Sequence, residues 1–293
     1  MNNAIEIRNL YKTYPGFSLN NISFTVPEGI CCGFVGPNGA GKTTTLRTLT
    51  GMAAPDSGQI RLLDQPVSSY SVREEMGILF DQPYFQEEWT PRDIERGLRP
   101  FYKSWDSGRY RSLLARFELD PRRKFKKFSR GMKMKLGLAV CLARETRLLL
   151  LDEPTGGLDP AARDEVLDLL REYMIPENRT ILFSTHITSD LERIADQIVY
   201  ISHGSISYCG SREELTSSYC MVRGYRLPRA KQHDAIGLRL TDSGYECLME
   251  LSRIGGLPVD AVIEPATIED VVVYCERKDR QPTLSPERSA DND

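Results

Sequence analysis

The sequence lacks a long hydrophobic run, a basic leader and any Cys-x-x-Cys pair. A membrane-spanning helix needs about 20 consecutive apolar residues. The longest apolar stretches of this 293-residue chain, at residues 137–143 and 148–151, are far shorter. Residues 1–6 (MNNAIE) also lack the basic region and apolar core that begin a secretory signal. We therefore expect the chain to remain in the cytoplasm.

Two further absences narrow the chemistry. The seven cysteines are scattered, so the spacings of zinc sites and thioredoxin-like motifs are missing, and we expect reduced thiols. The charges nearly cancel, with 38 Lys and Arg against 41 Asp and Glu. A dedicated nucleic-acid binder usually carries a basic excess. The composition therefore predicts no nucleic-acid partner.

The order of the expected elements predicts an α/β fold. Apolar strand-like runs alternate with helical patterns up to about residue 218, which favours a largely parallel sheet. Helical spacing dominates residues 84–135. Residues 219–280 carry short strand candidates and one late helix, which predicts a small accessory domain. Residues 281–293 are almost entirely polar, and we expect a disordered tail there.

Several helix starts follow from capping-box patterns, in which a Ser or Thr side chain and an acidic residue three positions later satisfy free backbone N–H groups. The clearest examples are Thr90-x-x-Asp93, Ser189-x-x-Glu192 and Thr267-x-x-Asp270.

A phosphate-binding loop is predicted after the apolar strand at residues 30–35. The segment Gly36-x-x-x-x-Gly41-Lys42-Thr43 matches the P-loop pattern. Its glycines let backbone N–H groups surround phosphate oxygens, and the following helix adds the positive end of its dipole. In this pattern Lys42 reaches the β- and γ-phosphates, and the Thr43 hydroxyl binds Mg²⁺.

Acidic residues and a histidine follow two other apolar strands. Asp152 and Glu153 come directly after residues 148–151, and His186 follows residues 181–185. Ligands of open α/β folds bind at the carboxyl ends of the strands. Asp152 suits a magnesium shell, and Glu153 suits a general base that activates water.

These motifs, in this order, give the chain a clear resemblance to an ATP-binding-cassette (ABC) ATPase subunit over residues 4–218. The Walker A loop is at 36–43, the signature motif at 128–132, Walker B at 148–153, the D-loop at 156–159, and the switch histidine is His186. The resemblance implies a P-loop NTPase core with a helical subdomain, followed by the small α/β extension.

The resemblance also implies the ligands and the residues that hold them. ATP and Mg²⁺ are the expected cofactors, with Lys42, Glu153 and His186 as catalytic residues. Thr43, Gln82 and Asp152 are expected around the metal. The residues expected to contact ATP are Tyr14, which would stack on adenine, and Gly36, Pro37, Asn38, Gly39, Ala40, Gly41, Lys42, Thr43, Thr44, Ser129, Gly131 and Asp159.

Two motifs depart from the family pattern. The signature usually reads Leu-Ser-Gly-Gly-Gln, but here it reads Phe128-Ser129-Arg130-Gly131-Met132, with Arg130 in place of the first glycine. Ser129 and Gly131, the phosphate-facing members, are kept. The Q-loop glutamine aligns with Asp81, and Gln82 comes one place later. Either Gln82 takes this role after a small shift, or Asp81 takes it with a carboxylate.

The resemblance implies a head-to-tail dimer of ATPase subunits, either a homodimer or a heterodimer with a paralogue. It would act at the cytoplasmic face of the membrane, on a separate permease subunit. The signature variant resembles ABC-2-type exporters, and the whole pattern resembles Gram-positive systems for antimicrobial or cytolytic peptides, of the bacitracin or phenol-soluble-modulin type. The alternatives are export of a drug or lipid, and a soluble ABC ATPase without a transport role.

Overall fold

The computed structural model describes residues 2–280, and side chains are described as far as residue 277. The chain divides into two compact units, Met1–Arg212 and Glu213–Asp293. The first unit thus ends at residue 212, whereas the sequence places the end of the ATPase domain at residue 218. The tail expected at residues 281–293 lies outside the described residues.

A six-stranded sheet forms the centre of the first unit, in the order β10-β9-β3-β8-β7-β6. All of its neighbouring strands are parallel except β10, which runs antiparallel to β9. Every residue of β3, β7 and β8 is buried, as expected for a parallel sheet that is covered on both faces. The strands are β3 (Cys31–Val35), β6 (Met76–Leu79), β7 (Leu148–Asp152), β8 (Thr180–Thr185), β9 (Gln197–Ser202) and β10 (Ser205–Ser211).

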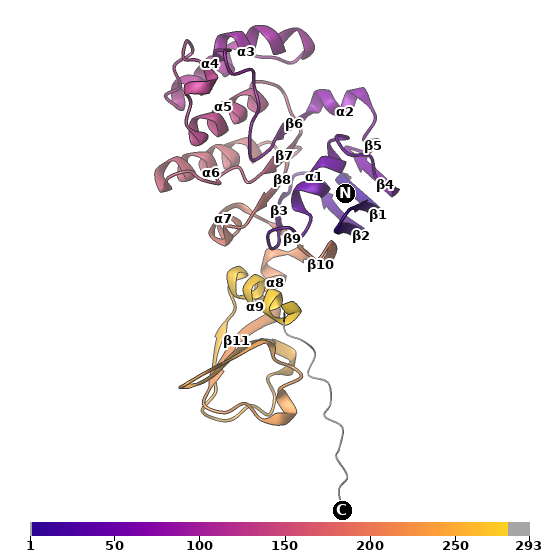
Figure 1. The fold of residues 1–293 in the computed structure, drawn as a ribbon, viewed down its shortest axis with the longest axis vertical. Coiled ribbons are helices and arrows are strands. Elements are labelled where there is room, and N and C mark those ends of the chain that lie inside the picture. Colours follow the sequence, from indigo (N-terminus) through magenta and orange to yellow (C-terminus); the bar gives the residue numbers. More distant parts are fainter. Residues whose placement is uncertain (1, 281–293) are drawn as a thin grey trace, which may run out of the picture. The chain divides into compact units, whose positions relative to one another are not determined.

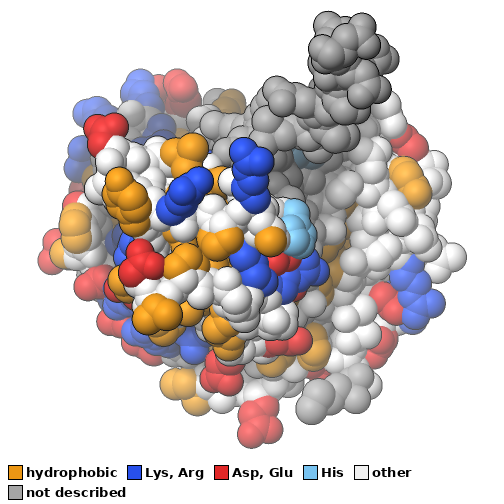
Figure 2. All heavy atoms as spheres, turned by 90° about the horizontal axis from the view of Figure 1, so that it is seen from below, with side chains coloured by type: hydrophobic (Ala, Val, Ile, Leu, Met, Phe, Trp, Pro, Cys, Tyr) orange, Lys and Arg blue, Asp and Glu red, His pale blue; other side chains and the backbone are white. Residues whose placement is uncertain are grey.

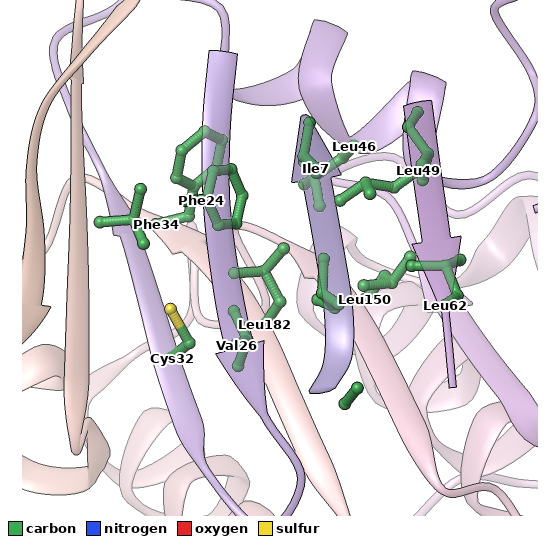
Figure 3. Close-up of a cluster of buried hydrophobic side chains, with 14 of the residues drawn as sticks. Ile7, Phe24, Val26, Cys32, Phe34, Leu46, Leu49, Leu62, Leu150 and Leu182 are labelled. Carbon is green, nitrogen blue, oxygen red and sulfur yellow. The ribbon is translucent and has the colours of Figure 1, made fainter. Parts of the chain in front are cut away.

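A second, antiparallel sheet in the first unit has the order β2-β1-β4-β5. Its strands are β1 (Asn3–Tyr14), β2 (Phe17–Pro27), β4 (Ser57–Leu62) and β5 (Gln65–Pro66). Side chains of this sheet and of the central sheet form one hydrophobic core. In Figure 3, Phe24 lies beside Phe34 of the parallel sheet, and Ile7 lies beside Leu46 of the same core cluster. The Phe24 and Phe34 ring centroids are 5.7 Å apart.

Seven α-helices of the first unit lie between or beside these strands. They are α1 (Lys42–Leu49), α2 (Tyr70–Glu75), α3 (Pro91–Leu98), α4 (Ser107–Arg116), α5 (Arg130–Leu142), α6 (Pro160–Met174) and α7 (Thr188–Ile194). Figure 1 shows α3, α4 and α5 gathered together, away from β1 and β2. This helical region was expected at residues 84–135, and α5 continues to Leu142.

The second unit is a four-stranded antiparallel sheet with a C-terminal helix. Its strand order is β12-β13-β11-β14. One core cluster contains Cys220, Val222, Tyr245, Cys247 and Met249. Its elements are α8, which starts at the boundary (Arg212–Ser218), β11 (Tyr219–Gly224), β12 (Ile236–Thr241), β13 (Gly244–Glu250), β14 (Val262–Pro265) and α9 (Ile268–Arg280).

The surface agrees with the balanced charge of the sequence. Figure 2 shows hydrophobic side chains scattered among basic and acidic ones on the face that it displays. Within the described residues, the helices are all too short or too polar to cross a membrane.

Candidate nucleotide-binding site

The P-loop leaves the carboxyl end of β3 and enters α1 at Lys42. Gly41 has a φ of 115°, a left-handed conformation that glycine adopts without steric cost. A Cβ on Gly36 would lie 2.1 Å from the carbonyl oxygen of Ile201, so the backbone there can approach β9 only as glycine. The compact shape of the loop therefore requires glycine at positions 36 and 41.

Lys42 curls back over this loop. Its Nζ donates to the carbonyl oxygens of Gly36 (2.6 Å) and Pro37 (3.1 Å). Burial lowers the pKa of Lys42, and the nearby carboxylates of Glu153 and Asp152 oppose that shift. A partly buried ammonium with only carbonyl acceptors would gain from an anionic ligand.

Asp152 is the best-fixed carboxylate of the site. It ends β7, is only 3% exposed, and accepts from Thr43 Oγ1 at 2.9 Å and from Ser184 Oγ at 2.5 Å. The pairing of β7 with β8 places Asp152 opposite Ser184. Ser184 is not predicted from sequence; the signal for it was its place at the end of an apolar strand, two residues before His186.

Glu153 and His186 meet at the same edge of the sheet. Glu153 Oε2 lies 2.8 Å from His186 Nδ1. Glu153 has a φ of 52°, a left-handed conformation that costs a non-glycine residue about 1–2 kcal/mol. Backbone strain of this kind is often found at functional sites.

A cavity of about 590 Å³ joins these groups. It is lined by Gly16, Phe17, Asn38, Gly39, Gly41, Lys42, Thr43, Thr44, Asp81, Asp152 and Glu153. The Walker A and Walker B residues predicted from sequence are therefore brought together. Tyr14 is not among the lining residues described, although Gly16 and Phe17 of the same hairpin are. Its side chain is 40% exposed and lies beside Lys12 Nζ, 5.4 Å from the ring centroid.

The Q-loop contributes Asp81 to this cavity. Gln82, which the sequence analysis placed at the metal, is exposed and is absent from the described lining residues. Of the two Q-loop alternatives, Asp81 is the one that lines the cavity, and a metal role for Gln82 stays a prediction. In the structure Arg130 Nη2 donates to Asp81 Oδ1.

The donor set fits magnesium. Thr43 and Asp152 present hard oxygen ligands side by side, and Mg²⁺ is usually bound by one or two protein oxygens together with phosphate and water. Among the described residues, there is no group of three or more His, Cys, Asp or Glu that could hold a metal ion. A magnesium ion here would therefore need phosphate and water to complete its shell.

The signature residues lie elsewhere in the same unit. Ser129, Gly131 and Asp159 line a second cavity, of about 540 Å³. Ser129 caps α5 by accepting from Met132 N at 3.2 Å. Asp159 caps α6, and the backbone N–H groups of that cap lower its pKa. One chain thus carries two separate cavities, each lined by a helix N-terminus or loop amides suited to an anion.

A buried network behind the site was not predicted. Asp190 is fully buried and accepts from Thr155 Oγ1 and Arg163 Nε, each at 2.6 Å. Arg163 Nη2 also donates to Ser189 Oγ. The network links the loop after Walker B, the helix after the D-loop and the helix after His186.

A P-loop, paired Walker carboxylates and a switch histidine at the edge of a parallel sheet define a nucleoside-triphosphate-binding protein. The sequence pattern of the ABC transporter family matches residues 19–156. An uncharacterized ABC transporter ATP-binding protein of Bacillus subtilis is 37% identical over 218 residues, which cover 72% of each chain. The chain belongs to the ABC transporter ATP-binding protein family, and it is an ATPase of that class.

Two further relatives are named for a lantibiotic transport role and for a drug-resistance role. The lantibiotic transport ATP-binding protein of Streptococcus pyogenes is 34% identical, covering 76% of this chain and all of that protein. The daunorubicin/doxorubicin resistance ATP-binding protein of Streptomyces peucetius is 35% identical, covering 79% of this chain and 71% of that one. A solved ATP-binding subunit of an ABC transporter has a TM-score of 0.65 at 27% identity, covering 72% of this chain and 91% of that one. The α/β P-loop fold expected from sequence is thereby confirmed.

Proposed function

We propose that this chain hydrolyses ATP to drive export of amphipathic or antimicrobial peptides through a separate membrane subunit. The observation that carries the ATPase part is the convergence of Lys42, Thr43, Asp152 and Glu153 on one cavity. The peptide part is supported by the lantibiotic relative and by the resemblance of the whole motif pattern to Gram-positive peptide exporters.

In this proposal Lys42 exchanges its carbonyl acceptors for the β- and γ-phosphates. Thr43 and Asp152 hold Mg²⁺, which neutralises charge on the phosphate oxygens. Glu153 accepts a proton from the attacking water, and His186, 2.8 Å from its carboxylate, orients that carboxylate.

The second half-site calls for a second cassette. Ser129, Gly131 and Asp159 line a cavity apart from the Walker A loop, so in the proposed head-to-tail dimer they meet the nucleotide held by the partner. The partner is a homologous ATPase subunit, and the dimer works at the cytoplasmic face of the membrane on the permease. This arrangement explains why one chain presents two incomplete anion sites.

The experiment is to co-express the tagged chain with any multispan membrane protein that a neighbouring reading frame encodes, and to reconstitute the purified complex in vesicles. We expect co-purification, and ATP hydrolysis that rises when a cationic amphipathic peptide is added. A complex carrying Glu153→Gln is the control for contaminating ATPases.

Drug export is the second candidate, because a relative of similar identity serves daunorubicin/doxorubicin resistance. Stimulation by an anthracycline but not by peptides would favour it. Failure to co-purify with any membrane protein, together with stable binding to ribosomes, would favour the soluble alternative.

A further inference from the structure

Asp81 and Arg130 form an ion pair between the two half-sites of one cassette. Arg130 Nη2 donates to Asp81 Oδ1. Asp81 lines the nucleotide cavity, while Arg130 lines the signature cavity with Ser129 and Gly131. Each of the two residues stands in a motif that departs from the family pattern, and the structure pairs them with each other.

Arg130 also lies along the D-loop. A Cβ on Gly157 would be 3.4 Å from both Cδ and Nε of Arg130, and a Cβ on Gly156 would be 3.7 Å from Nη2. The guanidinium group therefore joins the Q-loop, the start of α5 and the loop that follows Walker B.

The nucleotide cavity has more carboxylates than cationic groups, and the ion pair of Asp81 with Arg130 reduces this excess of negative charge. Three carboxylates, those of Asp81, Asp152 and Glu153, line the cavity with one ammonium, that of Lys42. A third carboxylate would repel a triphosphate unless a cation neutralised it. Arg130 supplies that cation from outside the cavity, and a bound magnesium ion would supply it from inside.

The ion pair is also weak enough for Asp81 and Arg130 to exchange each other for new partners. The side chain of Arg130 is 54% exposed and that of Asp81 is 36% exposed. An ion pair between side chains this exposed contributes about 0–1 kcal/mol to the free energy of unfolding. Binding of a magnesium nucleotide can therefore break it at small cost.

We propose that Asp81 and Arg130 form an exchangeable pair that senses the magnesium nucleotide. Arg130 neutralises Asp81 until magnesium and ATP enter the cavity. Asp81 then turns to the magnesium shell, and the freed guanidinium of Arg130 faces the phosphates held by the partner cassette, next to Ser129 and Gly131. The inference rests on the proposed dimeric ATPase and makes Arg130 a further phosphate-facing group.

The test uses three variants that restore the usual family residues: Arg130→Gly, Asp81→Gln and the double variant. The readout is the dissociation constant of a fluorescent non-hydrolysable ATP analogue, measured with Mg²⁺ and again with a chelator. The ratio of the two constants reports how strongly binding depends on magnesium. Lys126→Gly is the matched control, because Lys126 is also exposed and pairs with Glu88, which is not among the described lining residues.

We expect Arg130→Gly to raise the magnesium dependence about two- to fivefold, the range for an exposed pair. The unneutralised Asp81 would repel the free triphosphate but bind magnesium more readily. Asp81→Gln should lower the dependence, and the double variant should match Asp81→Gln because Arg130 then has nothing to neutralise. The magnesium dependence of Arg130→Lys should be close to that of wild type. This variant is the control for a folding defect caused by the glycine substitution.

The second readout is the dimer that ATP induces when hydrolysis is blocked by Glu153→Gln. Adding Arg130→Gly should lower the dimer fraction on size exclusion at saturating nucleotide. Equal magnesium dependence in Arg130→Gly and Lys126→Gly, or independent effects of the two substitutions in the double variant, would overturn the inference. Failure of the wild-type chain to bind the analogue at all would refute the proposed function instead.

Discussion

Replacing Ser184 by alanine removes the hydroxyl that donates to Asp152 at the carboxyl end of β8. In the structure Asp152 is 3% exposed, and it accepts only from Ser184 (2.5 Å) and Thr43 (2.9 Å) among the side-chain donors described. The substitution therefore leaves one carboxylate oxygen without its partner. It also removes the acceptor that Glu153 N contacts at 3.3 Å.

The size of the effect follows from the charge of the acceptor. A hydrogen bond to a charged group contributes about 1.5–3 kcal/mol. If the loss appears in the transition state, kcat/KM for ATP falls about 10- to 150-fold, since each 1.4 kcal/mol is a factor of ten. We also expect a higher magnesium concentration for half-maximal activity, because a loosened Asp152 holds the metal less well.

The assay is steady-state ATP hydrolysis over a series of magnesium concentrations, with thermal unfolding of each variant measured alongside. The matched control is Thr180→Ala, which removes another fully buried hydroxyl from the opposite end of β8, where it accepts from Gly29 N at 3.0 Å. An Ser184→Ala enzyme with unchanged kcat/KM and magnesium response, or a control that shows the same losses, would refute this reasoning.

Three further outcomes are expected. Hydrogen bonds from two lysines lower the pKa of Glu88 from 4.5 to about 2, so its contribution to stability is present above pH 4.5 and is lost as the pH falls toward 2. The melting temperature of Glu88→Gln should accordingly be below that of wild type at pH 7, and the gap should close in acid. Gly36→Ala should abolish ATP binding, measured by fluorescence titration, because its Cβ would lie 2.1 Å from Ile201 O, whereas the Cβ of Gly39→Ala meets no atom within 4 Å and is opposed only by the φ of 81° at Gly39, so this variant should lose less binding than Gly36→Ala. Asp190→Asn removes the charged acceptor of a buried network and should lower the free energy of unfolding by about 1–3 kcal/mol, measured by denaturant titration, with a drop in kcat.

The sequence predicts the parts of this site that depend on local chain geometry. A P-loop is one contiguous turn, and Asp152 and Glu153 follow a strand whose apolar run is visible by itself. The confirmed helix starts are local too: Thr90 and Thr267 both form the reciprocal contacts of a capping box. Each of these features is determined within a few residues.

The features that were missed depend on contacts between distant segments. The sequence leaves Asp81 and Gln82 as alternatives, and it does not show that Asp81 accepts from Arg130, which is 49 residues away. The predicted capping box at Ser189 is wrong: Ser189 lies within α7, whose N-cap is Ile187. Its hydroxyl instead accepts from Arg163 of a different helix.

The central claim is that Glu153 activates water for ATP hydrolysis in a cavity formed by the Walker residues. Its most direct test is to measure, for the purified wild-type chain and for Glu153→Gln, both the binding and the magnesium-dependent hydrolysis of ATP. We expect equal binding but hydrolysis that is slower by about 10²–10⁴, the usual scale for loss of a general base. Hydrolysis by Glu153→Gln at close to the wild-type rate would contradict the claim.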